Sequence, residues 1–179
     1  MATSPATDLA LARGLIRDVP DFPRPGILFK DITPLVADAK GLRATMDALE
    51  ARARPLRPDR IVGIESRGFV FGAALADRLR LGLSLVRKVG KLPYKTDRIE
   101  YELEYGKGVL EAHVDAVRAG ERVLVVDDLL ATGGTAWGAA QLVERQKGTV
   151  AGFLFVIELA FLDGRKRLPQ APVEALIAY

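Results

Sequence analysis

Short apolar runs alternate along the chain with segments in which apolar residues recur every three or four positions. The runs are rich in β-branched residues and predict buried strands over residues 60–65, 83–87, 122–126 and 150–157. The periodic segments predict helices over residues 40–54, 68–79 and about 135–146. Strands that alternate with helices predict an α/β fold with an open, mainly parallel twisted sheet flanked by helices.

The first forty residues depart from this alternation. Asp8 is placed to cap a short helix, because apolar residues recur after it as far as Ile16. The next segment, residues 19–34, contains four prolines, the last of which is Pro34. Proline lacks a backbone donor and restricts the residue before it, so we expect this segment to be extended and stiff, without helix.

A polar segment that contains glycine and proline covers residues 89–100. This composition is typical of a mobile surface loop. After it, residues 101–105 and 109–114 alternate between apolar and polar positions, which predicts a β-hairpin joined at Gly106–Gly108. We therefore expect a mobile loop and a hairpin beside the parallel strands.

The composition is that of one globular domain, with 179 residues of which 49% are hydrophobic and 27% charged. A chain of this length buries about 70% of its unfolded surface, so a single domain over residues 1–179 is expected. The absence of cysteine excludes disulfides, thiolate zinc sites and a cysteine nucleophile. The only histidine, His113, lies away from every motif, and we expect it at the solvated surface.

The charge pattern favours a small ligand over nucleic acid. The formal net charge of +3 is too small to indicate a nucleic-acid-binding face. Arg52, Arg54, Arg57 and Arg60 form a basic cluster, but prolines interrupt it, and a solvated turn after a helix explains it better. The chain shows no signal peptide and no apolar stretch long enough for a bilayer, so we expect a cytoplasmic protein that binds no membrane.

The most informative stretch is VLVVDDLLATGGT, residues 123–135. Its second half turns from a strand into a helix, and it contains Ala131, Thr132, Gly133, Gly134 and Thr135. The glycines let the backbone approach an anion closely, and the helix start supplies free N–H groups and a favourable dipole. With the two threonine hydroxyls as further donors, this turn is a candidate phosphate site.

The first half of the same stretch delivers two carboxylates, Asp127 and Asp128, to the carboxyl end of a buried strand, where open α/β sheets bind ligands. Adjacent carboxylates do not suit a bare phosphate. They suit the vicinal hydroxyls of a ribose, which need acceptors, and a nearby magnesium ion, which prefers oxygen. A sugar that carries a terminal phosphate explains both halves of the stretch.

The common nucleotide motifs are absent, since the chain has neither a P-loop sequence nor a Gly-x-Gly-x-x-Gly fingerprint. A plain strand end with an Asp cap and a Gly-rich turn is the alternative interpretation. The combination of strand, paired aspartates and Thr-Gly-Gly-Thr in one unit favours the functional interpretation.

This stretch resembles the motif with which type I phosphoribosyltransferases bind 5-phosphoribosyl 1-pyrophosphate. Four further segments resemble, in their order, the branch of that family that uses adenine: DFPRPGILFKDITPL, GIESRGFVFG, RKVGKLPYKT and YELEYG. The resemblance runs from about Leu15 to the C-terminus. The loop motif alone indicates the family, and the four other segments indicate the branch.

The resemblance implies the type I fold, with about residues 1–38 as a helix and a hood over the base and about residues 88–108 as a flexible lid. It implies a purine salvage enzyme that converts adenine and phosphoribosyl pyrophosphate to AMP and diphosphate. It also implies Mg²⁺, held mainly through the substrate's own oxygens and water. A homodimer is implied as well, without nucleic acid or membrane as partner.

Loss of diphosphate from the sugar builds negative charge on the leaving group, so cations aimed at that group are the largest expected contribution. Arg67 follows a strand and precedes a helix, where a guanidinium could hold a diphosphate, and the resemblance assigns it this contact. Arg87, Lys88 and Lys91 lie where a strand enters the polar loop and suit a closing lid. The resemblance implies that Arg87 serves the neighbouring subunit. For Arg67 the alternative is a surface arginine in a turn, and for the three loop cations it is a solvated basic loop.

The base needs a flat apolar contact and hydrogen-bonding groups at its edge. Phe29 could stack on a purine, although an ordinary core aromatic is an equal alternative. The resemblance places backbone groups of Leu28 and Lys30 against the edge of adenine. Lys30 stands where many relatives carry arginine, which matters little if the contact is made by the backbone.

A carboxyl group near the purine could manage the proton at N7 while N9 attacks the sugar. Alternation places Glu100, Glu102 and Glu104 on one strand face, and the pattern alone does not choose among them. The resemblance chooses Glu104 as the catalytic residue. A solvated strand face is the alternative.

Two other functions fit parts of the pattern. The same chemistry on a 6-oxopurine would favour a cationic donor in the base pocket, and Lys30 keeps that option open. A non-catalytic regulator that senses phosphoribosyl pyrophosphate and binds nucleic acid would need a further domain or a concentrated basic face. The chain has neither, so this alternative ranks last.

Overall fold

The computed structural model describes residues 5–103 and 106–179, and only the backbone at residues 5–8, 102, 103, 106 and 107. These residues form two compact units, of which the first ends at Ala48 and the second begins at Leu49. Within the described residues, no helix is both long and apolar enough to span a membrane.

The first unit contains two helices and a hairpin before α3 (Ala39–Ala53), which begins in this unit. Helix α1 (Pro5–Gly14) leads into β1 (Arg17–Pro20), which pairs antiparallel with β2 (Leu28–Asp31), and α2 (Thr33–Ala37) follows. Of the segment predicted to be extended, residues 19–20 and 28–31 are strand, whereas residues 21–26 form the turn of the hairpin, so the prediction is only partly confirmed. Ion pairs across the hairpin join Arg17 to Asp31 at 2.6 Å and Lys30 to Asp18 at 2.6 Å.

Two predictions for this unit are wrong. Helix α1 begins at Pro5, so Asp8 lies inside the helix and not at its cap. Pro34 was expected to exclude helix, but it occupies the first turn of α2. Proline is tolerated there because the first N–H groups of a helix have no partner within the helix.

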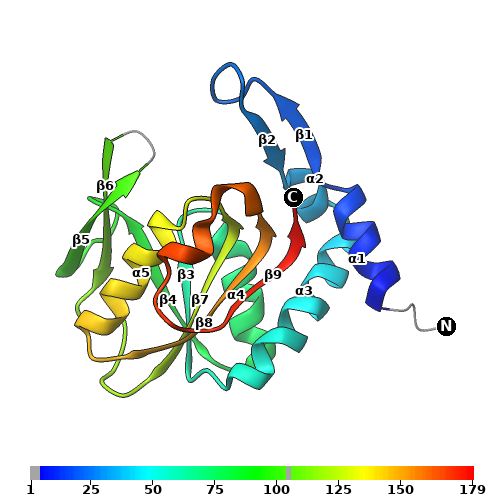
Figure 1. Ribbon diagram of the computed structural model, residues 1–179. Coiled ribbons are helices and arrows are strands. Elements are labelled where there is room, and N and C mark those ends of the chain that lie inside the picture. Colours follow the sequence, from blue (N-terminus) through cyan, green and yellow to red (C-terminus); the bar gives the residue numbers. More distant parts are fainter. Residues whose placement is uncertain (1–4, 104–105) are drawn as a thin grey trace. The chain divides into compact units, whose positions relative to one another are not determined.

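The second unit is built on a seven-stranded sheet in the order β5-β6-β4-β3-β7-β8-β9, coloured from green to red in Figure 1. Its strands are β3 (Arg60–Ile64), β4 (Gly82–Lys88), β5 (Thr96–Leu103), β6 (Gly106–His113), β7 (Arg122–Leu130), β8 (Thr149–Glu158) and β9 (Val173–Ala178). Strands β4, β3, β7, β8 and β9 run parallel, and β5 and β6 form an antiparallel hairpin on β4. The predicted α/β fold with a mainly parallel sheet is confirmed.

Two helices cover the sheet. Helix α4 (Gly68–Leu79) connects β3 to β4, and α5 (Gly134–Arg145) connects β7 to β8 (Figure 1). The two connections lead in opposite directions along the sheet, so right-handed crossovers place the helices on opposite faces. The strand order thus reverses between β3 and β7. In open sheets this point, at the carboxyl ends of the strands, is where ligands bind.

Small residues allow both helices to lie close to the sheet. A Cβ on Gly72 of α4 would lie 3.4 Å from the Cα of Gly63 in β3. A Cβ on Gly138 of α5 would lie 3.1 Å from a side-chain carbon of Leu110 in β6. Because helices cover both faces of the sheet, its central strands are buried on both faces. Strand β8, for example, is buried along nearly its whole length.

The structure corrects three predictions around the hairpin and the C-terminus. The expected loop over residues 89–100 is shorter, because β5 already begins at Thr96. The expected turn at Gly106–Gly108 belongs to β6, where Gly108 pairs with Tyr101. Strand β9 was not predicted, since its six residues carry no turn signal and pair only with the distant β8. The short 3-10 turns η1 (Arg54–Leu56), η2 (Ala160–Leu162) and η3 (Gly164–Arg167) complete the unit.

Candidate active site

A cavity of about 500 Å³ lies at the carboxyl ends of β3 and β7, where the strand order reverses. Six residues singled out in the sequence line it together: Arg67, Lys88, Asp127, Asp128, Ala131 and Thr135. Sequence analysis missed five others in its wall, Glu65, Ser66, Leu129, Tyr101 and Leu110. The first two could have been found because they precede Arg67, whereas the last two come from the hairpin and have no local signal.

The turn after β7 encloses a smaller hollow of about 70 Å³ that shares Asp127, Ala131 and Thr135 with the cavity. Thr132, Gly133 and Gly134 also line it. Gly133 stands at the N-cap of α5 with φ of +79°, a conformation that favours glycine. The hollow therefore faces the N-terminus of a twelve-residue helix, which favours an anion.

This phosphate loop, residues 131–135, is supported from behind by the turn η3. A Cβ on Gly133 would lie 2.4 Å from the carbonyl oxygen of Gly164, and a Cβ on Gly164 would lie 2.1 Å from that of Ala131. Both distances are far shorter than van der Waals contact, so neither position accepts a side chain without backbone movement. Arg165 anchors the turn, since its guanidinium binds both carboxylate oxygens of Glu158 at 2.7 and 2.6 Å. The sequence analysis did not single out Gly164.

We expect Gly164→Ala to displace the phosphate loop while leaving the sheet intact. The methyl group meets a backbone carbonyl, so the loop must shift, and the KM for phosphoribosyl pyrophosphate should rise about tenfold or more. Steady-state kinetics and a thermal melt check this. Gly14→Ala is the matched control, because a Cβ there meets no atom within 4 Å. Wild-type KM in Gly164→Ala would contradict the role of this turn.

The paired carboxylates lie beside a single guanidinium. Nε of Arg67 lies 2.8 Å from Oδ2 of Asp128, and the backbone N–H of Asp128 donates to Oδ1 of Asp127 at 2.8 Å. Gly68 makes this proximity possible, because a Cβ there would lie 2.7 Å from Oδ1 of Asp127. The start of α4 thus comes directly against the end of β7.

Both carboxylates have pKa values above the usual range. Burial raises the pKa of Asp127 strongly, and the neighbouring charge of Asp128 raises it further. Burial also raises the pKa of Asp128, although the nearby Arg67 opposes this. The pair therefore resists carrying two charges in the free protein.

A further carboxylate, Glu65, binds the side chain of Arg87 and the backbone of Lys88. Nε and Nη2 of Arg87 each donate to Glu65 at 3.2 Å, and the backbone N–H of Lys88 donates to the same carboxylate at 3.0 Å. Burial raises the pKa of Glu65, but these hydrogen bonds together outweigh it and leave the pKa below its usual value. Nη1 of Arg87 also donates to the carbonyl of Lys91 at 3.0 Å.

The remaining predicted residues are not placed in this cavity by the described contacts. Leu28, Phe29 and Lys30 lie on β2 in the first unit, where Phe29 meets Phe22 edge to face with ring centroids 5.1 Å apart. Lys91 is exposed and does not line the cavity. Glu104 lies outside the described residues.

The prediction of a solvated surface histidine is wrong. His113 is half-buried, its ring meets Tyr94 edge to face, and its Nε2 is buried without a hydrogen-bond partner in the described part of the chain. It lines a separate cavity of about 370 Å³ with Arg60 and Ser84, at the start of β3. As expected, it lies away from the candidate active site.

With this geometry established, comparisons identify the family. Residues 40–171 match the phosphoribosyl transferase domain family. The adenine phosphoribosyltransferase of Gloeobacter violaceus is 60% identical over 92% of this chain and 96% of its own length. The chain belongs to the adenine phosphoribosyltransferase family.

Solved structures agree with this placement. The adenine phosphoribosyltransferase of Thermoanaerobacter pseudethanolicus has a TM-score of 0.93 and 50% identity, over 96% of this chain and 99% of its own. The Saccharomyces cerevisiae enzyme has a TM-score of 0.89 and 40% identity, over 96% and 99% of the two chains, and was solved with an imino-altritol bisphosphate and adenine. The family resemblance of the motifs is thus confirmed across nearly the whole chain.

Proposed function

We propose that this protein transfers the phosphoribosyl group of phosphoribosyl pyrophosphate to adenine, forming AMP and diphosphate in purine salvage. The observation that carries the proposal is one cavity that combines paired carboxylates, a phosphate loop and Arg67. In the reaction, the bond between C1 of the sugar and the diphosphate oxygen breaks, and a bond from N9 of adenine to C1 forms. The proton of the base leaves, and diphosphate departs with its electron pair.

Different regions of the cavity bind different groups of the substrate. The phosphate loop and the N-terminus of α5 bind the 5′-phosphate, since they offer backbone N–H groups and the hydroxyls of Thr132 and Thr135. Asp127 and Asp128 accept hydrogen bonds from the ribose hydroxyls. This arrangement aligns the sugar so that its anomeric carbon faces the base and the diphosphate on opposite sides.

Cations stabilise the leaving diphosphate. Arg67 and Lys88 both line the cavity, and a guanidinium can bind a diphosphate through two N–H groups. In the free protein Arg67 pairs with Asp128, so substrate binding replaces this contact with one to diphosphate. We assign Arg87 and Lys91 to the lid that carries further positive charge to the same group.

Adenine binds through the hairpin of the first unit in this proposal. Phe29 supplies the flat contact, and backbone groups of Leu28 and Lys30 meet the edge of the base. The ammonium of Lys30 already pairs with Asp18 at 2.6 Å, so its charge is partly neutralised. A backbone contact to adenine is therefore favoured over a cationic contact to a 6-oxopurine.

Glu104 manages the proton of the base in this proposal, and Glu104→Ala tests it. A lost general acid or base typically costs about 100-fold or more in turnover, so kcat should fall while both KM values stay within about threefold. Steady-state kinetics measure this, with Glu144→Ala on α5 as the control. An unchanged kcat would contradict this role and support the alternative, in which Glu104 lies on a solvated strand face.

Magnesium fits this site as a partner of the substrate. The described residues contain no group of three or more histidine, cysteine or acidic side chains that could hold a metal ion. Magnesium usually binds through one or two carboxylates together with substrate phosphates, and the cavity is lined by the carboxylates of Glu65, Asp127 and Asp128. When bound, the ion would neutralise part of the diphosphate charge.

A homodimer is also part of the proposal, and so is the reach of Arg87 into the neighbouring subunit's site. In this chain Arg87 binds Glu65 and the carbonyl of Lys91, so that reach requires these contacts to open. Sedimentation of the purified protein measures the dimer. The cytoplasmic location remains a prediction from the sequence.

One assay tests the function. Purified protein, magnesium and phosphoribosyl pyrophosphate are incubated with a panel of purines and pyrimidines, and diphosphate release is followed. Adenine should be the preferred base. Preference for hypoxanthine or guanine would support the 6-oxopurine alternative, and release with no base would refute the transferase. The regulator alternative would require binding of DNA that weakens with salt.

A further inference from the structure

Glu111 on β6 is a buried carboxylate to which the proposed reaction assigns no role. Its residue is 1% exposed, and it does not line the active-site cavity. Oε1 accepts hydrogen bonds from the backbone N–H groups of Lys91 at 3.0 Å and Leu92 at 3.1 Å. Oε2 accepts from the hydroxyl of Thr96 at 3.2 Å and pairs with Arg98 at 3.3 Å. One carboxylate thus collects donors from the loop after β4 and from the first residues of β5.

These donors keep the carboxylate ionised. Burial raises the pKa of Glu111, but the backbone N–H groups of Leu92 and Lys91 and the hydroxyl of Thr96 together outweigh it, so the pKa lies below its usual value. A buried charge that is fully hydrogen-bonded is costly to disturb, because removing it leaves several donors without an acceptor. Glu111 is therefore a rigid attachment point for residues 90–98.

The attached segment contains Lys91 and follows directly on Arg87 and Lys88 at the end of β4. Arg87 stands directly opposite Glu111 in the register of β4 and β6. The peptide groups of Lys91 link the two residues, because its N–H donates to Glu111 and its carbonyl accepts from Arg87. Arg87 in turn binds Glu65 in the cavity wall, beside Lys88. A continuous set of hydrogen bonds joins Glu111 to the diphosphate end of the cavity.

We propose that Glu111 is a positioning residue for diphosphate recognition. It holds the segment from Gly90 to Thr96 against the sheet, so that Glu65, which binds Arg87 and the backbone of Lys88, keeps Lys88 in one geometry in the cavity wall before the substrate arrives. A preordered cation site binds more tightly because less conformational freedom is lost on binding. The inference rests on the proposed function, since it assigns the cations to diphosphate.

Glu111→Ala is the main test. The KM for phosphoribosyl pyrophosphate should rise about tenfold, while kcat and the KM for adenine change less than about threefold. Hydrogen exchange supplies a readout that does not depend on activity: the amides of Lys91 and Leu92 should exchange faster in the variant. Glu111→Gln keeps an amide oxygen for these N–H groups but loses the charge that pairs with Arg98. Glu111→Gln should show a smaller increase in this KM, about threefold. It replaces Glu111→Ala as the test if the alanine variant does not fold.

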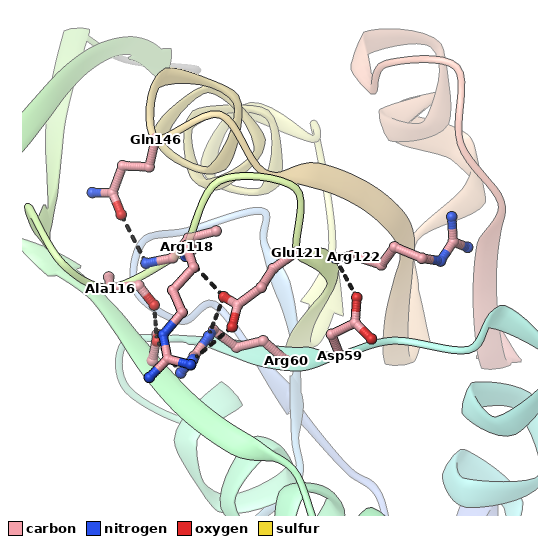
Figure 2. A network of polar contacts seen from close by, with 9 residues as sticks. Asp59, Arg60, Ala116, Arg118, Glu121, Arg122 and Gln146 are labelled. Carbon is pink, nitrogen blue, oxygen red and sulfur yellow. Dashed lines mark hydrogen bonds and ion pairs between the residues drawn. The ribbon is translucent and has the colours of Figure 1, made fainter.

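Glu121 provides a matched control at the other end of the sheet. Its carboxylate binds Nε and Nη2 of Arg60 at 2.6 and 2.9 Å and accepts from the backbone N–H of Arg118 at 2.8 Å (Figure 2). Glu121→Ala therefore also removes a half-buried, charged acceptor from a polar network. It should lower the melting temperature without changing the KM for phosphoribosyl pyrophosphate or the exchange at Lys91 and Leu92.

The outcomes separate the two claims. A folded Glu111 variant with wild-type KM for phosphoribosyl pyrophosphate, or with unchanged exchange at Lys91 and Leu92, overturns the positioning role and leaves the proposed function intact. The role is also overturned if Glu121→Ala raises that KM equally, because the effect would then be general. If the wild-type protein itself binds no phosphoribosyl pyrophosphate, the proposed function fails and the inference fails with it. The exchange data would then report only whether Glu111 holds the loop.

Discussion

The double variant Asp127→Asn, Asp128→Asn should lose phosphoribosyl pyrophosphate binding by a factor on the order of 100 or more. In the proposed complex the carboxylates accept hydrogen bonds from the ribose hydroxyls, and a hydrogen bond to a charged group contributes about 1.5–3 kcal/mol. Asparagine has nearly the same shape but presents a donor where the site needs an acceptor. Calorimetric titration measures the affinity. Asp59→Asn is the control, because Asp59 accepts a hydrogen bond from Arg122 at the opposite end of β7 (Figure 2).

The same variant should be at least as stable as the wild type at neutral pH. Burial and mutual repulsion raise the folded-state pKa values of both carboxylates above those of an unfolded chain. Their ionisation therefore opposes folding, and this cost disappears as the pH falls through the raised values. We expect a higher melting temperature at pH 7–8 in the double variant and a smaller difference at pH 4. Wild-type affinity, or a large loss of stability, would contradict the assignment of a ligand-binding pair.

Arg67→Gln should lower kcat/KM by a factor on the order of 100 to 1000, the usual effect of removing a preordered charge that stabilises a transition state. Arg67 lies at the N-cap of α4 and lines the cavity, where it can reach the leaving diphosphate. The substitution also removes the partner of Asp128, so the melting temperature should be measured alongside the kinetics.

Arg78→Gln is the matched control for this prediction. Arg78 stands in the last turn of the same helix and pairs with Glu50 at 3.3 Å, away from the cavity residues. Its loss should leave kcat/KM within about twofold, because an ion pair of this kind contributes little to stability and nothing to the reaction. Equal effects of the two substitutions would show that Arg67 acts on the helix and not on the leaving group.

The local sequence pattern was sufficient to predict the two helices that cover the sheet and the loop after β7. Helix α4 begins and ends where its periodicity predicts, and α5 does so within one residue. The phosphate loop and its two aspartates also lie where the motif indicates, at the carboxyl end of β7. These features depend on neighbours in sequence: an apolar run, a glycine turn and a helix start, each with its own physical preference.

Two wrong predictions came from applying the usual preferences of proline and glycine at positions where an exception holds. Pro34 was taken as excluding helix, although the first turn of a helix tolerates it. The hairpin turn was placed at Gly106–Gly108 because glycine usually marks turns, but Gly108 pairs within a strand opposite Tyr101. A Cβ at Gly108 would lie 2.5 Å from the ring of Tyr101, so here glycine makes room for an aromatic side chain.

The chain's linear pattern thus accounts for the central parallel strands, for α4 and α5, and for the chemistry gathered after β7. Folding was needed to reveal which distant residues support that chemistry: Gly164 behind the phosphate loop, Arg67 beside Asp128, and Glu111 beneath the lid segment. A strand or a turn can be predicted from its own residues, because their conformational preferences favour it. A contact between residues far apart in the chain leaves no periodic trace, because the sequence around one partner does not indicate which distant residue it will meet.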